Sequence, residues 1–253
     1  MKYEIKEFSD GQVSAEIIQG GDIRVRIKGT SYADLFEAAA VKNAFDSVHA
    51  MIKPKATATL EIDCLIGQRS DRRFEKQVSF DLKIIAAFIN SMKYDRVNIM
   101  HPHSDATCIL IDNAYAIKPT EYIGRALADM DATVMVSPDA GAYKYTYDIA
   151  EKLQMELVAA NKVRIDGEPA ITVQGDVKGK DCLIVDDIAD GGRTFVALAK
   201  KLKEQGASKV CLYVTHGMFH YGFNELKEHI DHIYCTNSYR EIKDEYITQF
   251  KIE

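Results

Sequence analysis

The sequence predicts an α/β fold made of two related halves, each with a mainly parallel sheet flanked by helices. Short apolar runs alternate with stretches that carry apolar residues at helical spacing. The run CLIV at 182–185 is continuously apolar, as a parallel strand buried on both faces is. RVNIMHPHSDA and CLIVDDIADGG both read as an apolar strand that breaks into a polar turn, which indicates two halves meeting near residues 115–125.

The individual elements follow from these patterns. Helices are expected at Phe80–Met92, where apolar residues recur at helical spacing, at Tyr143–Leu153 after a glycine, and at Thr194–Gln205, which ends at Gly206, a natural C-cap. Strands are expected at Ile23–Ile27, Ala58–Ile62, Arg96–Met100, Thr133–Val136, Leu157–Ala160, Asp181–Val185, Lys209–Val214 and His232–Cys235.

The composition is that of an ordinary globular protein. The 253 residues are 47% hydrophobic and 28% charged, and the net charge of −6 argues against nucleic-acid or anionic-membrane partners. No apolar run approaches the roughly 20 residues of a membrane span, and the charged start MKYEIKEFSDG is not expected to be a signal peptide. The five cysteines are odd in number and lack metal-ligand spacing. A reducing, cytoplasmic location is therefore expected.

The stretch DDIADGGRT, which follows CLIV, carries the clearest chemical signal. Ligands of open α/β sheets bind beyond the carboxyl ends of strands, where this stretch is expected to lie, with Thr194 opening the next helix. The glycines permit a tight turn whose amides, together with a helix N-terminus, would hold a phosphate. Asp186 and Asp187 would accept hydrogen bonds from vicinal sugar hydroxyls. The alternative is a helix N-cap with solvated acids, but adjacent acids at a strand end fit that alternative poorly.

The same stretch resembles the ribose-binding motif shared by type I phosphoribosyltransferases and ribose-phosphate diphosphokinases. Further segments are similar to the diphosphokinases in particular, in the same order along nearly the whole chain. They are EFSDGQV at 7–13, IGQRSDRRF at 66–74, VNIMHPHSDA at 97–106, VSPDAGAYKYTYDIAEKL at 136–153, NKVRI at 161–165, GDVKGKDCLIVDD at 175–187 and YVTHGMF at 213–219. A purine phosphoribosyltransferase would not need the FSDG and RSDR segments.

The resemblance implies two type I phosphoribosyltransferase-like domains, 1–117 on the nucleotide side and 118–253 with the ribose-phosphate loop. It implies transfer of the terminal diphosphate of ATP to an anomeric hydroxyl, with Mg²⁺ as cofactor. It also implies at least a homodimer, because the FSDG loop of the relatives serves a neighbouring subunit. The ribose-phosphate group would be bound by Asp186, Asp187, Asp190, Gly191, Gly192, Arg193 and Thr194.

Three further groups of residues receive roles through the resemblance. Lys162 and Arg164, placed just after the expected strand ELVAA, resemble loop cations that stabilise the transferring diphosphate, although two such cations are often only a solvated edge. His103 and Asp139 resemble magnesium ligands; taken alone, they would be a turn histidine and a helix N-cap. ATP would be bound by Phe8, Asp10, Gln12, Arg69, Ser70, Asp71 and His103.

The chain also departs from the family pattern. Gly191 replaces a hydroxyl that would grip a terminal 5′-phosphate, and a cation appears at Arg193. Gln12, Ser70 and Ala142 replace an acid, a glutamine and a glycine, and the family's strand and helix before FSDG are missing. These changes imply a shortened, divergent member.

The departures leave three readings open. The acceptor is ribose 5-phosphate, or it is ADP-ribose, whose 5′-phosphate continues into a second phosphate that would suit the DGGRT loop. ADP-ribose pyrophosphate synthesis is associated with compact phage relatives that rebuild NAD, which would act in a host cytoplasm. Alternatively, the chain is a non-catalytic partner of a full-length synthetase.

Overall fold

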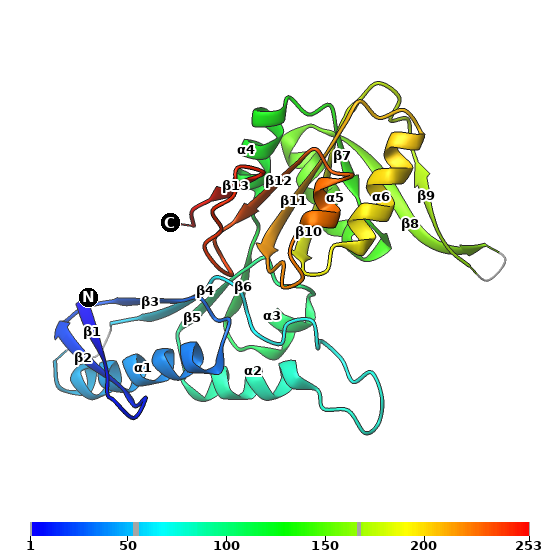
Figure 1. Ribbon diagram of the computed structural model, residues 1–253. Coiled ribbons are helices and arrows are strands. Elements are labelled where there is room, and N and C mark those ends of the chain that lie inside the picture. Colours follow the sequence, from blue (N-terminus) through cyan, green and yellow to red (C-terminus); the bar gives the residue numbers. More distant parts are fainter. Residues whose placement is uncertain (1, 53–55, 166–167, 253) are drawn as a thin grey trace. The chain divides into compact units, whose positions relative to one another are not determined.

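The computed structural model describes residues 2–52, 56–165 and 168–252, and the chain divides into two compact units, 1–118 and 119–253 (Figure 1). The predicted α/β class, with mainly parallel sheets flanked by helices, is confirmed. Every strand expected from the sequence is present within one residue of its expected start, and each expected helix is present.

Unit 1 (residues 1–118) is built on a four-stranded parallel sheet. The strands β3 (Ile23–Ile27), β4 (Ala58–Ile62), β5 (Arg96–Met100) and β6 (Ala114–Ile117) are neighbours in chain order. The connections carry the helices α1 (Tyr32–Ile52), α2 (Asp81–Ser91) and α3 (Ala106–Leu110). An antiparallel hairpin of β1 (Lys2–Glu7) and β2 (Val13–Gln19) precedes the sheet.

The two faces of the unit 1 sheet differ in polarity because its strands alternate. Ile23, Val25 and Ile27 point into a core that α1 and α2 cover. Arg24 and Arg26 point to the opposite face, where both form ion pairs with Glu61 at N–O distances of 3.4 and 3.7 Å. The strands of this unit therefore read as alternating rather than continuously apolar.

Unit 2 (residues 119–253) is built on a seven-stranded sheet in the order β13-β12-β11-β10-β7-β8-β9. All neighbours are parallel except β8 and β9. The strands are β7 (Val134–Ser137), β8 (Glu156–Ile165), β9 (Glu168–Gln174), β10 (Asp181–Ala189), β11 (Lys209–Gly217), β12 (His232–Thr236) and β13 (Ile247–Phe250), and the helices are α4 (Thr120–Met130), α5 (Ala140–Leu153), α6 (Arg193–Glu204) and α7 (Asn224–Lys227).

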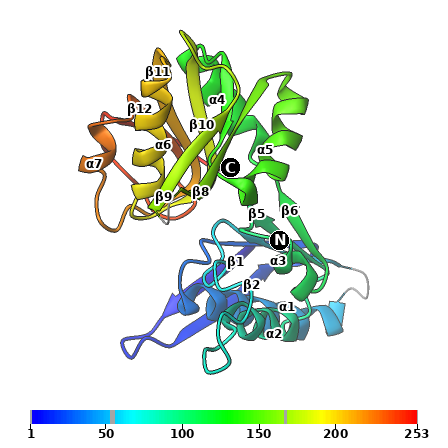
Figure 2. The same cartoon turned by 90° about the vertical axis from the view of Figure 1, so that its right-hand side faces the viewer.

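Helices cover both faces of the unit 2 sheet (Figure 2). Cys182 and Ile184 of β10 point into the core beneath α6, whereas Leu183 and Val185 point into the core beneath α4 and α5. This central strand is thus buried on both sides, as its continuous apolar sequence predicts.

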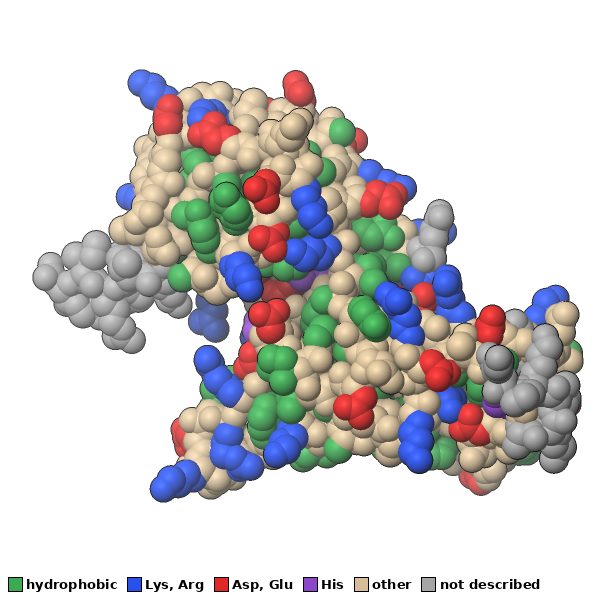
Figure 3. Space-filling model, turned by 180° about the vertical axis from the view of Figure 1, so that it is seen from behind, with side chains coloured by type: hydrophobic (Ala, Val, Ile, Leu, Met, Phe, Trp, Pro, Cys, Tyr) green, Lys and Arg blue, Asp and Glu red, His purple; other side chains and the backbone are tan. Residues whose placement is uncertain are grey.

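The surface shows a mixed charge distribution. On the face shown in Figure 3, Lys and Arg side chains are interspersed with Asp and Glu side chains. All five cysteines are free thiols, and four of them are buried. Among the helices of the described residues, none combines the length and the apolar character needed to cross a membrane.

Candidate functional site: an acidic strand end beside a glycine loop

The strand β10 corrects one expectation from the sequence, because it does not end at Val185. It continues through Asp186 and Asp187 to Ala189, paired with β11 as far as Ala189 and Gly217. Pairing with β7 on the other side stops at Ile184 and Val136. Pairing with β11 on both sides of Asp187, at Asp186 and Ile188, thus keeps the two acids in the strand despite their polarity. They lie beyond the last residue pair that β10 makes with β7.

A third acid, Asp139, lies near them because β7 ends at Ser137. Asp139 is the N-cap of α5, and its Oδ1 accepts the backbone N–H of Ala142 at 3.0 Å. The N-cap that the sequence predicts for this residue taken alone is therefore present. Burial raises the pKa of Asp186 well above the ordinary carboxyl value, and the charges of Asp187 and Asp139 add to the shift. The N–H of Asp187, 2.9 Å from Oδ1 of Asp186, opposes it. Asp139, Asp186 and Asp187 thus lie near one another, although burying carboxylates without compensating partners is unfavourable.

The glycine loop, Asp190-Gly191-Gly192, follows β10 directly and leads into α6. Gly192 is the N-cap of α6 with φ 74°, a conformation that favours glycine, and a Cβ there would lie 2.9 Å from Cδ2 of Leu226. A glycine cap has no side chain to accept the first amides of the helix. Arg193 and Thr194, both exposed, form the first helical turn. The loop therefore has the local structure expected of an anion cradle.

Gly191 has no such structural requirement. Its φ lies outside the positive region, and a Cβ would meet only Cδ2 of Tyr221, at 3.7 Å, which is ordinary contact. The exchange of a hydroxyl residue for glycine at this position is therefore not imposed by the fold.

Two residues near the glycine loop, His220 and Tyr239, were not predicted from the sequence. His220 Nδ1 lies 2.9 Å from Oδ1 of Asp190, and its Nε2 lies 2.8 Å from the hydroxyl of Tyr239. His220 follows β11, which neighbours β10 in the sheet, and Tyr239 follows β12, the next strand beyond β11. The rule that the carboxyl ends of adjacent parallel strands share one edge is the signal that could have found them.

Lys162 and Arg164 require a second correction. Both lie within β8, whose backbone continues to Ile165 and pairs with β9, and not in a loop after the strand. Pairing of Lys162 with Ile171 and of Arg164 with Pro169 explains the extension. The side chains of both residues lie outside the described part of the chain.

In unit 1, the FSDG segment forms the turn of the β1–β2 hairpin. The N–H of Phe8 donates to the carbonyl of Gln12 at 2.9 Å, and Oδ1 of Asp10 accepts the N–H of Gln12 at 3.0 Å. Gly11 provides the positive φ of 84°. The Phe8 side chain is 52% exposed, which leaves its ring available for contact.

The RSDR and HPH segments follow β4 and β5 and meet at one edge of the unit 1 sheet. The N–H of His103 donates to Oε1 of Gln68 at 3.0 Å, which joins the two segments. His103 and Arg69 are exposed, whereas His101 is buried with φ 38°. Ser70 and Asp71 are half-buried beside them in the chain. The structure thus brings together His103 with the segment that carries Arg69.

The two expected metal ligands belong to different units, His103 to unit 1 and Asp139 to unit 2. Within the described ranges, no group of three or more His, Cys, Asp or Glu residues gathers as a metal site. The carboxylate of Asp139, in its acidic surroundings, suits a hard cation such as Mg²⁺, which prefers oxygen ligands. The imidazole of His103 suits it less well.

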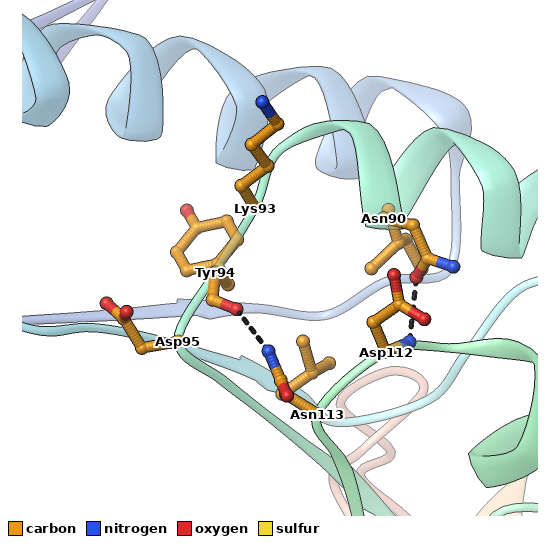
Figure 4. Close-up of a pocket in the computed structure, with 8 residues that line it drawn as sticks. Asn90, Lys93, Tyr94, Asp95, Asp112 and Asn113 are labelled. Carbon is orange, nitrogen blue, oxygen red and sulfur yellow. Dashed lines mark hydrogen bonds between the residues drawn. The ribbon is translucent and has the colours of Figure 1, made fainter.

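A cavity of about 200 Å³ lies elsewhere in unit 1 (Figure 4). Two of its asparagine side chains hydrogen-bond the backbone: Asn90 Nδ2 donates to the carbonyl of Leu110 at 3.0 Å, and Asn113 Nδ2 donates to the carbonyl of Tyr94 at 3.2 Å. The cavity contains none of the residues expected to bind ligand.

Comparisons with known proteins agree with this geometry. A family model described as "Phosphoribosyl synthetase-associated domain" matches residues 148–251. Ribose-phosphate pyrophosphokinase of Mycoplasma genitalium is 32% identical over 201 residues, 73% of this chain and 59% of that protein. Ribose-phosphate pyrophosphokinase of Chromobacterium violaceum is 30% identical over 229 residues, 85% of this chain and 68% of that protein.

The fold agrees as well. The crystal structure of phosphoribosylpyrophosphate synthetase from Mycobacterium smegmatis superimposes with a TM-score of 0.78 at 21% identity, over 99% of this chain and 86% of that one. The matched region spans about 60% of the Mycoplasma protein's length. With its acidic strand end, glycine loop and parallel sheets in place, the chain belongs to the ribose-phosphate pyrophosphokinase family.

Proposed function

We propose that the chain is an ATP-dependent diphosphokinase that transfers the terminal diphosphate of ATP to the anomeric hydroxyl of a ribose 5-phosphate group and releases AMP. The anomeric oxygen attacks the β-phosphorus, the bond from that phosphorus to the α,β-bridging oxygen breaks, and the hydroxyl proton is released. Such a displacement depends on positioned charge around the polyphosphate more than on covalent chemistry.

The observation that carries this proposal is the juxtaposition of the acids and the loop. Asp186 and Asp187 lie near the end of the buried strand β10, which ends at Ala189 and is followed directly by a glycine loop at a helix N-terminus. An anion cradle alone fits any phosphate, and acids alone fit many polar ligands. Acids that accept from the 2- and 3-hydroxyls, followed directly by a phosphate loop, match a ribose 5-phosphate group in both parts.

The nucleotide is assigned to unit 1. Phe8 would stack on adenine and Asp10 would accept from its exocyclic amine, while Arg69, Asp71 and His103 would contact the purine and phosphates. Phe8 and Asp10 are exposed on the hairpin turn, and Arg69 and His103 are exposed in the loops after β4 and β5, which supports this role. Gln12 and Ser70 would complete these contacts.

Contacts to the polyphosphate are assigned to the cationic side chains of Lys162 and Arg164, and Asp139 and His103 are each assigned as a Mg²⁺ ligand. When bound, the metal would neutralise charge on the polyphosphate. The negative charges of Asp139 and Asp187, which raise the pKa of Asp186, favour a cation near Asp139.

The acceptor is proposed to be ADP-ribose in preference to ribose 5-phosphate. Gly191 leaves the loop without a hydroxyl for a terminal phosphate, although the fold tolerates a Cβ at this position. Arg193 adds an exposed cation at the first turn of α6, suited to a second phosphate. The double variant Gly191→Thr with Arg193→Gly should shift kcat/KM toward ribose 5-phosphate. An unchanged ratio would show that the loop does not select the acceptor.

The assembly is proposed to be a homodimer or larger homo-oligomer in which the FSDG turn serves a neighbouring subunit. A mixture of Phe8→Ala and Lys162→Ala proteins should then regain activity through hybrid sites. A fully active monomer at high dilution would contradict this assembly.

The proposed reaction is tested by incubating the purified chain with Mg-ATP and either acceptor while AMP is followed. Acceptor-dependent AMP release supports it. If AMP appears only after a full-length synthetase is added, the chain is a non-catalytic partner subunit instead.

A further inference from the structure

The segment that follows β11, residues 218–222, lies against the glycine loop. The N–H groups of Met218 and Phe219 both donate to the carbonyl of Ala189, at 2.9 and 3.1 Å. Ala189 is the last residue of β10, immediately before Asp190. The backbone therefore fixes the position of this segment relative to the start of the loop.

Side chains strengthen this connection. Nδ1 of His220 forms a hydrogen bond with Oδ1 of Asp190, at 2.9 Å, and Nε2 of the same ring forms one with the hydroxyl of Tyr239, at 2.8 Å. The rings of His220 and Tyr239 meet edge to face with centroids 5.4 Å apart. His220 thus braces the segment between the loop and the end of β12.

The backbone of the segment is held in an unfavourable conformation. Phe219 has φ 46°, in the left-handed region that non-glycine residues rarely adopt, and its side chain is only 1% exposed. Arg240 donates from Nη2 to the Phe219 carbonyl at 3.1 Å. Burial of Phe219 on one side of this turn directs the following residues toward the loop.

Tyr221 is the residue that this arrangement presents. Its side chain is 85% exposed, so burial of the ring contributes little to the stability of the fold. Its Cδ2 nevertheless lies beside Gly191, within 3.7 Å of where a Cβ would be. An exposed aromatic face therefore stands at the edge of the proposed phosphate cradle, near the loop that leads into Arg193.

We propose that Tyr221 is a specificity-determining residue that stacks on the nucleotide portion of an acceptor extending beyond its 5′-phosphate. This assignment rests on the proposed function and deepens it. Gly191 leaves room for the ring, and an acceptor that ends at the 5′-phosphate does not reach its exposed face. His220 is a positioning residue that holds Tyr221 in place through Asp190 and Tyr239.

The test compares Tyr221→Ala and Tyr221→Phe with Tyr147→Ala, which removes an exposed tyrosine of α5 in the same unit. Base stacking on an aromatic ring predicts that Tyr221→Ala lowers kcat/KM for ADP-ribose on the order of 10- to 100-fold. Activity on ribose 5-phosphate should stay within about twofold, because that acceptor does not reach the ring. Tyr221→Phe and Tyr147→Ala should retain the wild-type preference.

The role of His220 is tested with a pair of conservative variants. His220→Asn keeps an N–H donor near the position of Nδ1 and so retains the bond to Asp190, whereas His220→Gln places its donor near Nε2 and loses that bond. His220→Gln should therefore reduce the preference for ADP-ribose, and His220→Asn should restore most of it. Equal preference in both variants would remove the positioning role.

Calorimetric binding of ADP-ribose without ATP separates this proposal from the reaction itself. If neither acceptor is turned over but Tyr221→Ala weakens ADP-ribose binding on the order of 10-fold or more, the stacking role stands and the diphosphokinase reaction fails. If turnover occurs but Tyr221→Ala leaves both acceptors unchanged, or weakens them equally, the stacking role is overturned. No ADP-ribose binding by the wild-type protein would also overturn it.

Discussion

Removal of the acids at the end of β10 is the perturbation that probes the site most deeply. Asp186→Ala and Asp187→Ala each remove one acceptor for a ribose hydroxyl. A hydrogen bond to a charged group contributes roughly 1.5–3 kcal/mol, which corresponds to a loss of about 10- to 150-fold in acceptor affinity. Asp181→Ala is the matched control, because Asp181 is the first residue of the same strand, at its opposite end.

A substitution at Asp186 should raise the stability of the ligand-free protein while it lowers acceptor affinity. Burial raises the pKa of Asp186, and repulsion from Asp187 and Asp139 adds to the shift. Asp186→Asn removes the carboxyl group, whose charged form is disfavoured by burial and by its acidic neighbours, while keeping the side-chain shape. We therefore expect the Tm of the ligand-free protein to rise while acceptor affinity falls, an opposition typical of residues retained for function.

The assay combines acceptor binding by calorimetry with thermal unfolding at neutral pH. A loss of affinity confined to Asp186→Ala and Asp187→Ala, with Asp181→Ala near wild type, agrees with ribose binding. Unchanged acceptor affinity in both site variants, or an equal loss in the control, would refute the assignment. A lowered Tm in Asp186→Asn would refute the reasoning about charge repulsion.

Three other predictions concern neighbouring parts of the site. Lys162→Ala or Arg164→Ala should lower kcat on the order of 100-fold or more with the fold intact, as circular dichroism would confirm, and near wild-type turnover would assign both to a solvated edge. Asp139→Ala should raise the Mg²⁺ concentration needed for half-maximal activity, and an unchanged magnesium titration would remove it from the metal. Gly192→Ala should lower the free energy of unfolding, measured by urea denaturation, by about 1 kcal/mol or more, because Gly192 has a left-handed conformation and a Cβ there would lie 2.9 Å from Leu226. Gly191→Ala should change the same free energy by less than about 0.5 kcal/mol. Equal effects of the two glycine variants would contradict this difference.

The core strands were predictable because their buried positions are apolar, either continuously or at every second residue. CLIV of β10 and the alternating IRVRI of β3 both occupy the expected positions. The ends of β8 and β10 were not predictable in the same way, because Lys162, Arg164 and the two acids are polar residues kept in strands by neighbouring backbones. Apolar periodicity does not report such pairing.

Elements without a strong apolar pattern were missed. The hairpin β1–β2 has mostly exposed positions, so only its turn signal FSDG was visible. The edge strands β6, β9 and β13 were missed as well. His220 was missed for another reason: its contact with Asp190 joins residues thirty positions apart, and only the sheet order brings them together.

The central claim is that this chain places a ribose 5-phosphate group for attack on the β-phosphorus of ATP. Phosphorus NMR of the reaction of the purified protein with Mg-ATP and ADP-ribose or ribose 5-phosphate tests it most directly. We predict one AMP for each acceptor consumed and a new diphosphate attached at the anomeric carbon. Formation of ADP with a monophosphorylated acceptor, or release of phosphate from ATP with the acceptor unchanged, would contradict it.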